Sequence, residues 1–230
     1  MKDFLTESVF FGVMLSLASY GVGVFMKKKT KMGIFNPLLI SIIITIIVLI
    51  VADIDYDIYY DGAKYISYLL TPATVSLAIP LYIQIEKLKK NWKAIIIGIS
   101  SGVITSIFTI FGFSLMLHFN HKEYVTFIPK SITTAIGMGV SEELGGFTAV
   151  TVSVIILTGV IGNVIAELVF KIFRIKDPIA RGIALGTSSH AIGTAKAMEL
   201  GELEGAMSSL SIVVAGIITV AAAGVFSNLV

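Results

Sequence analysis

The chain has 230 residues, of which 56% are hydrophobic and 14% are charged, and its formal net charge is +2. Typical soluble domains contain about 45–50% apolar and about 25% charged residues, so a mean hydropathy of +0.93 excludes an ordinary soluble fold. The absence of cysteine excludes disulfide and thiol chemistry. We therefore expect an all-α integral membrane protein in which residues 1–230 form a single multi-pass domain.

Six windows without Asp, Glu, Lys or Arg are long enough to cross a hydrocarbon core of ~30 Å, which takes about 20 helical residues. In chain order they are 8–26, 32–52, 65–85, 94–117, 144–166 and 205–230. Two other apolar segments, 131–141 and 182–195, are too short to span comfortably. The sequence therefore predicts about six full spans and two short re-entrant or broken helices.

A further interruption is expected inside the third window, where the sequence TPATVSLAIP at 71–80 contains two prolines. Proline removes a backbone donor and clashes with the preceding turn, so it kinks or breaks a helix. The region 65–117 is a weaker candidate for an additional repeat unit. We include its polar residues Thr71 and Thr74 among the candidate substrate-binding residues.

The distribution of charge predicts the membrane topology, because cytoplasmic loops carry an excess of Lys and Arg. Three basic loops and one acidic loop separate the windows: Lys27, Lys28, Lys29 and Lys31; Lys87, Lys89, Lys90 and Lys93; Lys171, Arg174, Lys176 and Arg181; and Asp53, Asp55, Asp57 and Asp61. All three basic loops are cytoplasmic only if segment 131–141 makes no net crossing. Windows 144–166 and 205–230 then cross in opposite directions.

Part of the chain is repeated. Segments 133–161 and 189–217 align without a gap at an offset of 56 residues and share nine identities, where about two or three are expected by chance. Each copy runs from a short polar segment, TTAIG or SHAIG, through Glu-Leu-Gly into a long apolar helix. Because the basic loops give the copies opposite orientations, we expect an inverted repeat with units at about 127–170 and 183–230.

A site for a small organic anion is expected where the two short segments meet. The N-terminus of a half-helix presents free N–H donors and about half a positive charge, so it attracts a carboxylate or phosphate without a buried cation. The polar residues around the two breaks are the main candidates for substrate binding: Thr133, Thr134, Ser188, Ser189 and His190. The alternative for each Ser and Thr is a hydrogen bond within its helix or to a neighbouring helix.

Three residues receive an additional interpretation. His190 lies inside a hydrophobic segment, where an ionisable group is a functional candidate by default, and its imidazole would donate to a carboxylate or carry a coupled proton; the alternative is a structural role. Lys196 is the preferred counter-charge among the charged residues at segment edges, Lys130 included, although such residues usually snorkel to the interface. Asn163, in the middle of a long helix, is a further candidate for substrate binding, where it would pair with an unwound backbone; the alternative is that it joins two helices.

An enzyme is the first alternative class, and the sequence offers little for it. The chain contains no H-E-x-x-H, G-x-S-x-G or Gly-rich phosphate-binding motif. No carboxylate is spaced to orient His190 within its own tract. We therefore expect no enzymatic activity, no cofactor, no metal site and no nucleic-acid partner.

Three segments resemble the LrgB/CidB family of antiholin-like and holin-like membrane proteins: LTPATVSLAIPLY at 70–82, IPKSITTAIG at 128–137 and DPIARGIALGTSSHAIGTAKAMELGELEGAMSSL at 177–210. The similarity covers nearly the whole chain. It implies an influence on murein hydrolase activity and lysis or, as in related pyruvate carriers and the plant plastid glycolate/glycerate translocator, transport of small monocarboxylates. It also implies a small LrgA-type membrane protein as partner. Ala135 stands where we expect proline in many relatives, which implies a softer kink.

The sequence as a whole favours a secondary transporter for a monocarboxylate of the pyruvate, lactate or glycolate class, working by alternating access in the bacterial plasma membrane. We also expect the chain to form homo-oligomers. The alternative is a holin-like or antiholin-like regulator of lysis, in which the membrane assembly itself is the activity. Such an assembly needs only oligomerising helices, so it leaves the symmetric polar breaks unexplained.

Overall fold

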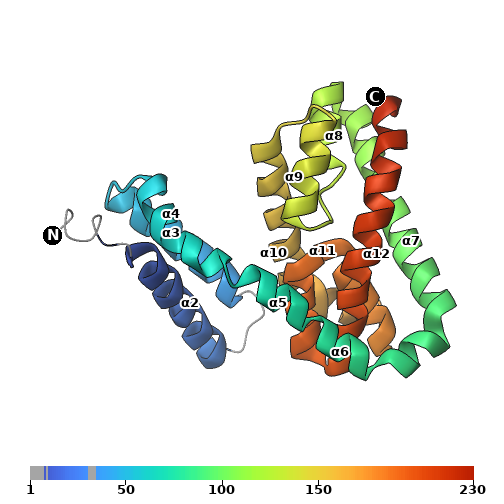
Figure 1. The fold of residues 1–230 in the computed structure, drawn as a ribbon, viewed down its shortest axis with the longest axis horizontal. Helices are drawn as coiled ribbons and strands as arrows, with labels where there is room; N and C mark the ends of the chain where they lie inside the picture. Colours follow the sequence, from blue (N-terminus) through green and yellow to red (C-terminus); the bar gives the residue numbers. More distant parts are fainter. Residues whose placement is uncertain (1–7, 9, 31–34) are drawn as a thin grey trace. The chain divides into compact units, whose positions relative to one another are not determined.

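The computed structural model describes residues 8, 10–30 and 35–230, and these residues form helices and connecting turns without a β-strand (Figure 1). The chain forms two compact units, Met1–Ser76 and Leu77–Val230. The helices of the first unit are α2 (Phe11–Thr30), α3 (Pro37–Val51), α4 (Tyr56–Ser67) and α5 (Leu70–Ser76). Those of the second are α6 (Ala78–Ile83), α7 (Ile85–Leu117), α8 (His121–Phe127), α9 (Thr134–Glu143), α10 (Thr148–Ile172), α11 (Pro178–Leu200) and α12 (Glu202–Phe226), with a 3-10 turn at Ser227–Leu229.

The first unit is held together by close contacts of α2 with α3 and α4. Two glycines of α2 make this approach possible. A Cβ atom on Gly12 would overlap the backbone of Tyr59, and one on Gly23 would lie 2.6 Å from the carbonyl oxygen of Pro37. Small residues at such contacts are typical of helices that pack within a membrane, where dispersion forces replace the hydrophobic effect.

The core of the second unit lies between α7, α11 and α12 (Figure 1). Apolar residues recur along α7 at spacings of four and seven, which places them on one face of a helix. This face is buried against α11 and α12 and consists of Leu88, Ile95, Ile99, Val103 and Ile107. The opposite side of α7 exposes large apolar residues such as Ile97 and Phe108, which suits a lipid environment.

Both predicted short segments contain a helix interruption. Segment 131–141 forms α9, whose 10 residues span about 15 Å at 1.5 Å per residue, half of a ~30 Å hydrocarbon core. Segment 182–195 lies inside α11, a 23-residue helix that is broken at His190. The second break is therefore inside a longer element than the sequence suggested. The proline-containing segment is also interrupted, because α5 ends at Ser76 and α6 begins at Ala78.

The long helices α10 and α12 run in opposite directions within the second unit. At one end, Thr151 near the start of α10 donates to the Thr126 carbonyl of α8 at 3.0 Å, and Ala223 near the end of α12 shares an apolar cluster with Tyr124 of α8. At the other end, the last part of α10 packs with Leu200, directly before α12 begins. The orientation of the two helices across a membrane stays a prediction.

Four stretches of the described residues are long and apolar enough to cross a membrane: Tyr56–Ile83, Ile85–Leu117, Thr148–Ile172 and Glu202–Leu229. The helix Pro37–Val51 is apolar but shorter. The all-helical membrane class is thus supported by length and composition, whereas the six full spans of the sequence analysis stay a prediction.

Candidate functional site

The most unusual backbone in the second unit is at His190. This residue has φ 43° and ψ −137°, and it divides α11 into helical halves at 178–189 and 191–200. Residues with a side chain rarely adopt positive φ, and a break at this depth leaves backbone groups without their i→i−4 partners. The sequence predicted an interruption here, and the structure places it at the histidine of SHAIG.

Glycines on α10 make room for the broken part of α11. A Cβ atom on Gly159 would lie 2.7 Å from the His190 ring, and one on Gly162 would overlap the hydroxyl of Ser189. Ser189 and His190 are almost completely buried, with 1% and 3% of their surface exposed. The absence of side chains at these two positions therefore lets the break lie directly against α10.

The imidazole of His190 is anchored to the backbone of α10. Its Nε2 lies 2.9 Å from the carbonyl oxygen of Ile155, and a carbonyl only accepts, so Nε2 carries the proton of this hydrogen bond. Among the described residues, Nδ1 has no hydrogen-bond partner. The ring thus has a structural role through Nε2, and Nδ1 is left for a further interaction.

The other predicted break faces the same turn of α10. Thr133 is the N-cap of α9, with extended backbone and no side-chain capping bond, and Thr134 is its first residue. A Cβ atom on Gly137 would overlap the side chain of Ile155, the residue whose carbonyl binds His190. Ile155 of α10 therefore contacts both α9 and the break in α11, and a shared level of the two breaks in the membrane stays a prediction.

Asn163 supports the broken helix from α10. Its Nδ2 donates to the carbonyl oxygen of Ile192 at 3.0 Å, two residues after the break. The side chain thus combines the two alternatives given by the sequence, because it binds backbone beside an interruption and also joins α10 to α11. We assign it a positioning role.

Lys196 lies close to two carboxylates, so its charge is already compensated. Its ammonium forms ion pairs with Glu167 of α10 and with Glu199. Such an arrangement stabilises a buried cation and leaves it poorly suited to attract a substrate anion. The role of Lys196 as substrate counter-charge stays a prediction, and a second lysine is also a candidate for it.

That lysine is Lys130, in the turn between α8 and α9. Its side chain lines two cavities, one of about 630 Å³ between α7 and the first half of α11, and one of about 400 Å³ between α10 and the same half of α11. Ser188 lines both cavities too. Nζ donates to Ser131 at 2.9 Å, and no carboxylate among the described residues pairs with it.

One residue in the lining of the larger cavity has a buried hydroxyl without a partner. Thr187 is 6% exposed, and its Oγ1 has no hydrogen-bond partner within the described part of the chain. On the facing wall, Ser106 of α7 lies within 3.2 Å of the Ser131 hydroxyl. An unpaired buried polar group of this kind costs about 1–3 kcal/mol.

The remaining predicted residues are distributed as follows. Ser188 is exposed to the cavities, and its hydroxyl donates to Ala184 of its own helix at 2.7 Å, which is the alternative expected for a membrane serine. Thr71 belongs to α5 in the first unit. The side chain of Thr74 lies outside the described residues. The part these threonines play in binding stays a prediction.

Changing His190 tests the anchoring of the break. His190→Gln retains a donor for the Ile155 carbonyl, so it should preserve the thermal stability of the detergent-solubilised protein. His190→Ala removes that donor and should lower the free energy of unfolding by about 1–3 kcal/mol. Equal melting temperatures for the two variants would contradict an anchoring role for the ring.

The apolar helices, four of them long and apolar enough to cross a membrane, and the helix broken at His190 together define the all-helical membrane class of protein. The chain belongs to the LrgB-like family, whose sequence model matches residues 16–229. This confirms the resemblance seen in the sequence.

Similar curated proteins carry the same family name. The antiholin-like protein LrgB of Bacillus subtilis (strain 168) is 38% identical over 226 residues, which cover 98% of each chain. The antiholin-like proteins LrgB of Bacillus cereus (strain B4264) and Bacillus anthracis (strain CDC 684 / NRRL 3495) are 38% identical over 216 residues, or 94% of each chain. No solved structure matches the chain.

Proposed function

We propose that this chain has the antiholin-like role for which its curated relatives are named, and that its molecular activity is the transfer of a small monocarboxylate across the bacterial plasma membrane. Membership of the LrgB-like family supports the first part. The observation that carries the second is the ammonium of Lys130, which lines two cavities and lacks a carboxylate partner among the described residues.

The geometry of the site favours a small carboxylate over a larger or neutral ligand. An ammonium with three donors would bind the two oxygens of one carboxylate. The cavities are otherwise lined mainly by apolar groups such as Ile183 and Ile165, which disfavour a second charge. Pyruvate, lactate and glycolate meet both conditions.

Alternating access fits the arrangement of the two cavities. They lie along neighbouring faces of the first half of α11 and share Lys130, Ala184 and Ser188. A movement of this half-helix would therefore change the access to Lys130 from one cavity to the other. In this proposal the two units around α9–α10 and α11–α12 form the inverted repeat that the sequence suggests.

Uptake by proteoliposomes that contain the purified chain alone tests the transport proposal. We expect saturable uptake of labelled pyruvate, lactate or glycolate above the level of protein-free liposomes, and competition among these anions. A transporter that needs an LrgA-type partner would show this uptake only after co-reconstitution. Uptake of none of the three anions with or without that partner would leave only the antiholin-like role.

The antiholin-like role has its own readout. Deletion of the gene in its host should change the rate of autolysis, and the wild-type chain should restore it. If a Lys130 variant without transport also restores normal autolysis, the regulatory role is independent of the anion site. The role would then belong to the assembly that the chain forms in the membrane, such as a homo-oligomer.

A further inference from the structure

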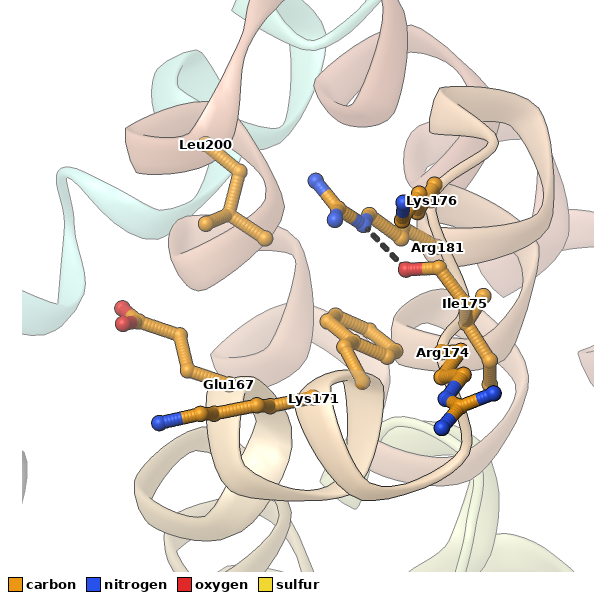
Figure 2. A pocket seen from close by; sticks show the side chains of 8 residues that line it. Glu167, Lys171, Arg174, Ile175, Lys176, Arg181 and Leu200 are labelled. Carbon is orange, nitrogen blue, oxygen red and sulfur yellow. Dashed lines mark hydrogen bonds between the residues drawn. The ribbon is translucent and has the colours of Figure 1, made fainter.

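A third cavity of the second unit, of about 480 Å³, lies between the end of α10 and the beginning of α11. Figure 2 shows this basic pocket, with Glu167 and Lys171 on one side and Lys176 and Arg181 on the other. Arg174 also contributes to its lining. The pocket shares Phe170 with one of the Lys130 cavities but does not include Lys130.

The charge of the basic pocket is largely uncompensated. Glu167 is the acidic residue of its lining, and it is paired with Lys196. The lining contains four cations, Lys171, Arg174, Lys176 and Arg181. None of them has a carboxylate partner among the described residues. A concentration of four positive charges around one cavity attracts a multivalent or strongly acidic anion.

Helix electrostatics explain only half of this cluster. Lys171 and Arg174 lie at the C-terminal end of α10, where cations offset the negative end of the helix dipole. Arg181 lies in the first turn of α11 and Lys176 directly precedes it, and a cation is unfavourable at the positive end of a helix. The helix dipole therefore accounts for two of the four charges and not for Lys176 and Arg181.

Arg181 is held in position for such a ligand. Its Nε donates to the Ile175 carbonyl at 2.9 Å, a bond drawn in Figure 2, and its guanidinium lies 5.6 Å from the centre of the Phe170 ring. These two contacts fix the plane of the guanidinium while its terminal nitrogens have no partner among the described residues. A fixed guanidinium with free terminal N–H groups matches the geometry of two phosphate oxygens.

We propose that the basic pocket binds a phosphate group, supplied by the headgroup of an anionic lipid or by a soluble organic phosphate. The basic loop that forms it is expected on the cytoplasmic side, where basic pockets between membrane helices bind anionic headgroups. Because the pocket does not contain Lys130, phosphate binding is independent of the anion transfer proposed above.

Calorimetric titration of the full-length protein in an uncharged detergent tests this proposal. One titration uses short-chain phosphatidylglycerol and the other uses glycerol 3-phosphate, so that a lipid and a soluble source are distinguished. Binding of either probe to the wild type is the expected result. Binding of neither would overturn the proposal.

Matched double substitutions locate the binding. Lys176→Gln with Arg181→Gln removes two charges from the pocket, and Lys89→Gln with Lys90→Gln removes two from an exposed face of α7. The pocket variant should bind at least about tenfold more weakly, since each lost charged hydrogen bond is worth roughly 10- to 150-fold, whereas the control should change less than about twofold. Equal losses in both variants would indicate non-specific attraction and overturn the assignment.

A single conservative substitution separates a loss of binding from a loss of folding. Arg181→Lys retains the charge but loses the planar group that donates to Ile175, so it should weaken binding while the melting temperature without probe stays close to that of the wild type. Unchanged affinity in this variant would contradict recognition by a fixed guanidinium.

Discussion

Replacing Lys130 with methionine should reduce saturable monocarboxylate uptake into proteoliposomes by roughly 10- to 150-fold, the value of a hydrogen bond to a charged group. The reason is that Lys130 is the cation that lines both cavities beside the broken helix and lacks a carboxylate partner among the described residues. Methionine keeps the length of the side chain and removes the charge. Initial rates over a range of substrate concentrations measure the effect.

Two control variants separate this charge from a general effect on the protein. Lys130→Arg retains a cation and should restore much of the uptake. Lys122→Gln removes a charge on α8, where the ammonium lies 4.3 Å from the centre of the Phe147 ring, and should leave uptake unchanged. Replacing a partly buried cation by an apolar residue should not destabilise the fold, so a Lys130→Met protein that melts normally and transports normally would refute the role of Lys130.

Introducing a single methyl group at Gly186 should destabilise the bundle by about 1–3 kcal/mol, the usual cost of overpacking. A Cβ atom at this position would overlap the carbonyl oxygen of Ser208 on α12, and a backbone atom within a packed helix has little freedom to move away. Thermal unfolding of Gly186→Ala in detergent measures the effect. We also expect a less uniform preparation in size-exclusion chromatography.

The same substitution elsewhere provides the control. Gly112 of α7 has no atom within 4 Å of a Cβ position, so Gly112→Ala should be neutral, or stabilising by up to about 1 kcal/mol, because alanine favours a helix over glycine. A Gly186→Ala protein that is as stable as Gly112→Ala would show that α11 and α12 do not pack as closely as described.

The hydrophobic windows predict most of the helices, but they misplace the ends of α11. The apolar segment 182–195 is bounded by the charged residues Arg181 and Lys196, which predicts a helix of that length, although the helix extends over Pro178–Leu200. These charges do not end the helix because Arg181 lies against Phe170 and Lys196 pairs with Glu167. Such partners come from α10 and are invisible to a window that reads one segment at a time.

The location of the breaks was predictable, whereas the contacts of the two lysines were not. The repeat pointed to TTAIG and SHAIG, and α9 begins at Thr134 while α11 breaks at His190. Lys196 and Lys130 look alike in sequence, because each lies at the edge of an apolar segment. Only the fold shows that Lys196 forms an ion pair with Glu167, 29 residues away, and that Lys130 donates a hydrogen bond to Ser131. A buried threonine without a partner, Thr187, likewise has no signature in the sequence.

The position of Ile155 links the two broken segments mechanically. Its carbonyl oxygen holds His190, and its side chain occupies the space left by Gly137 of α9. A shift or rotation of this turn of α10 would therefore displace both interruptions together. In a carrier built in this way, the two broken segments would not move independently of each other.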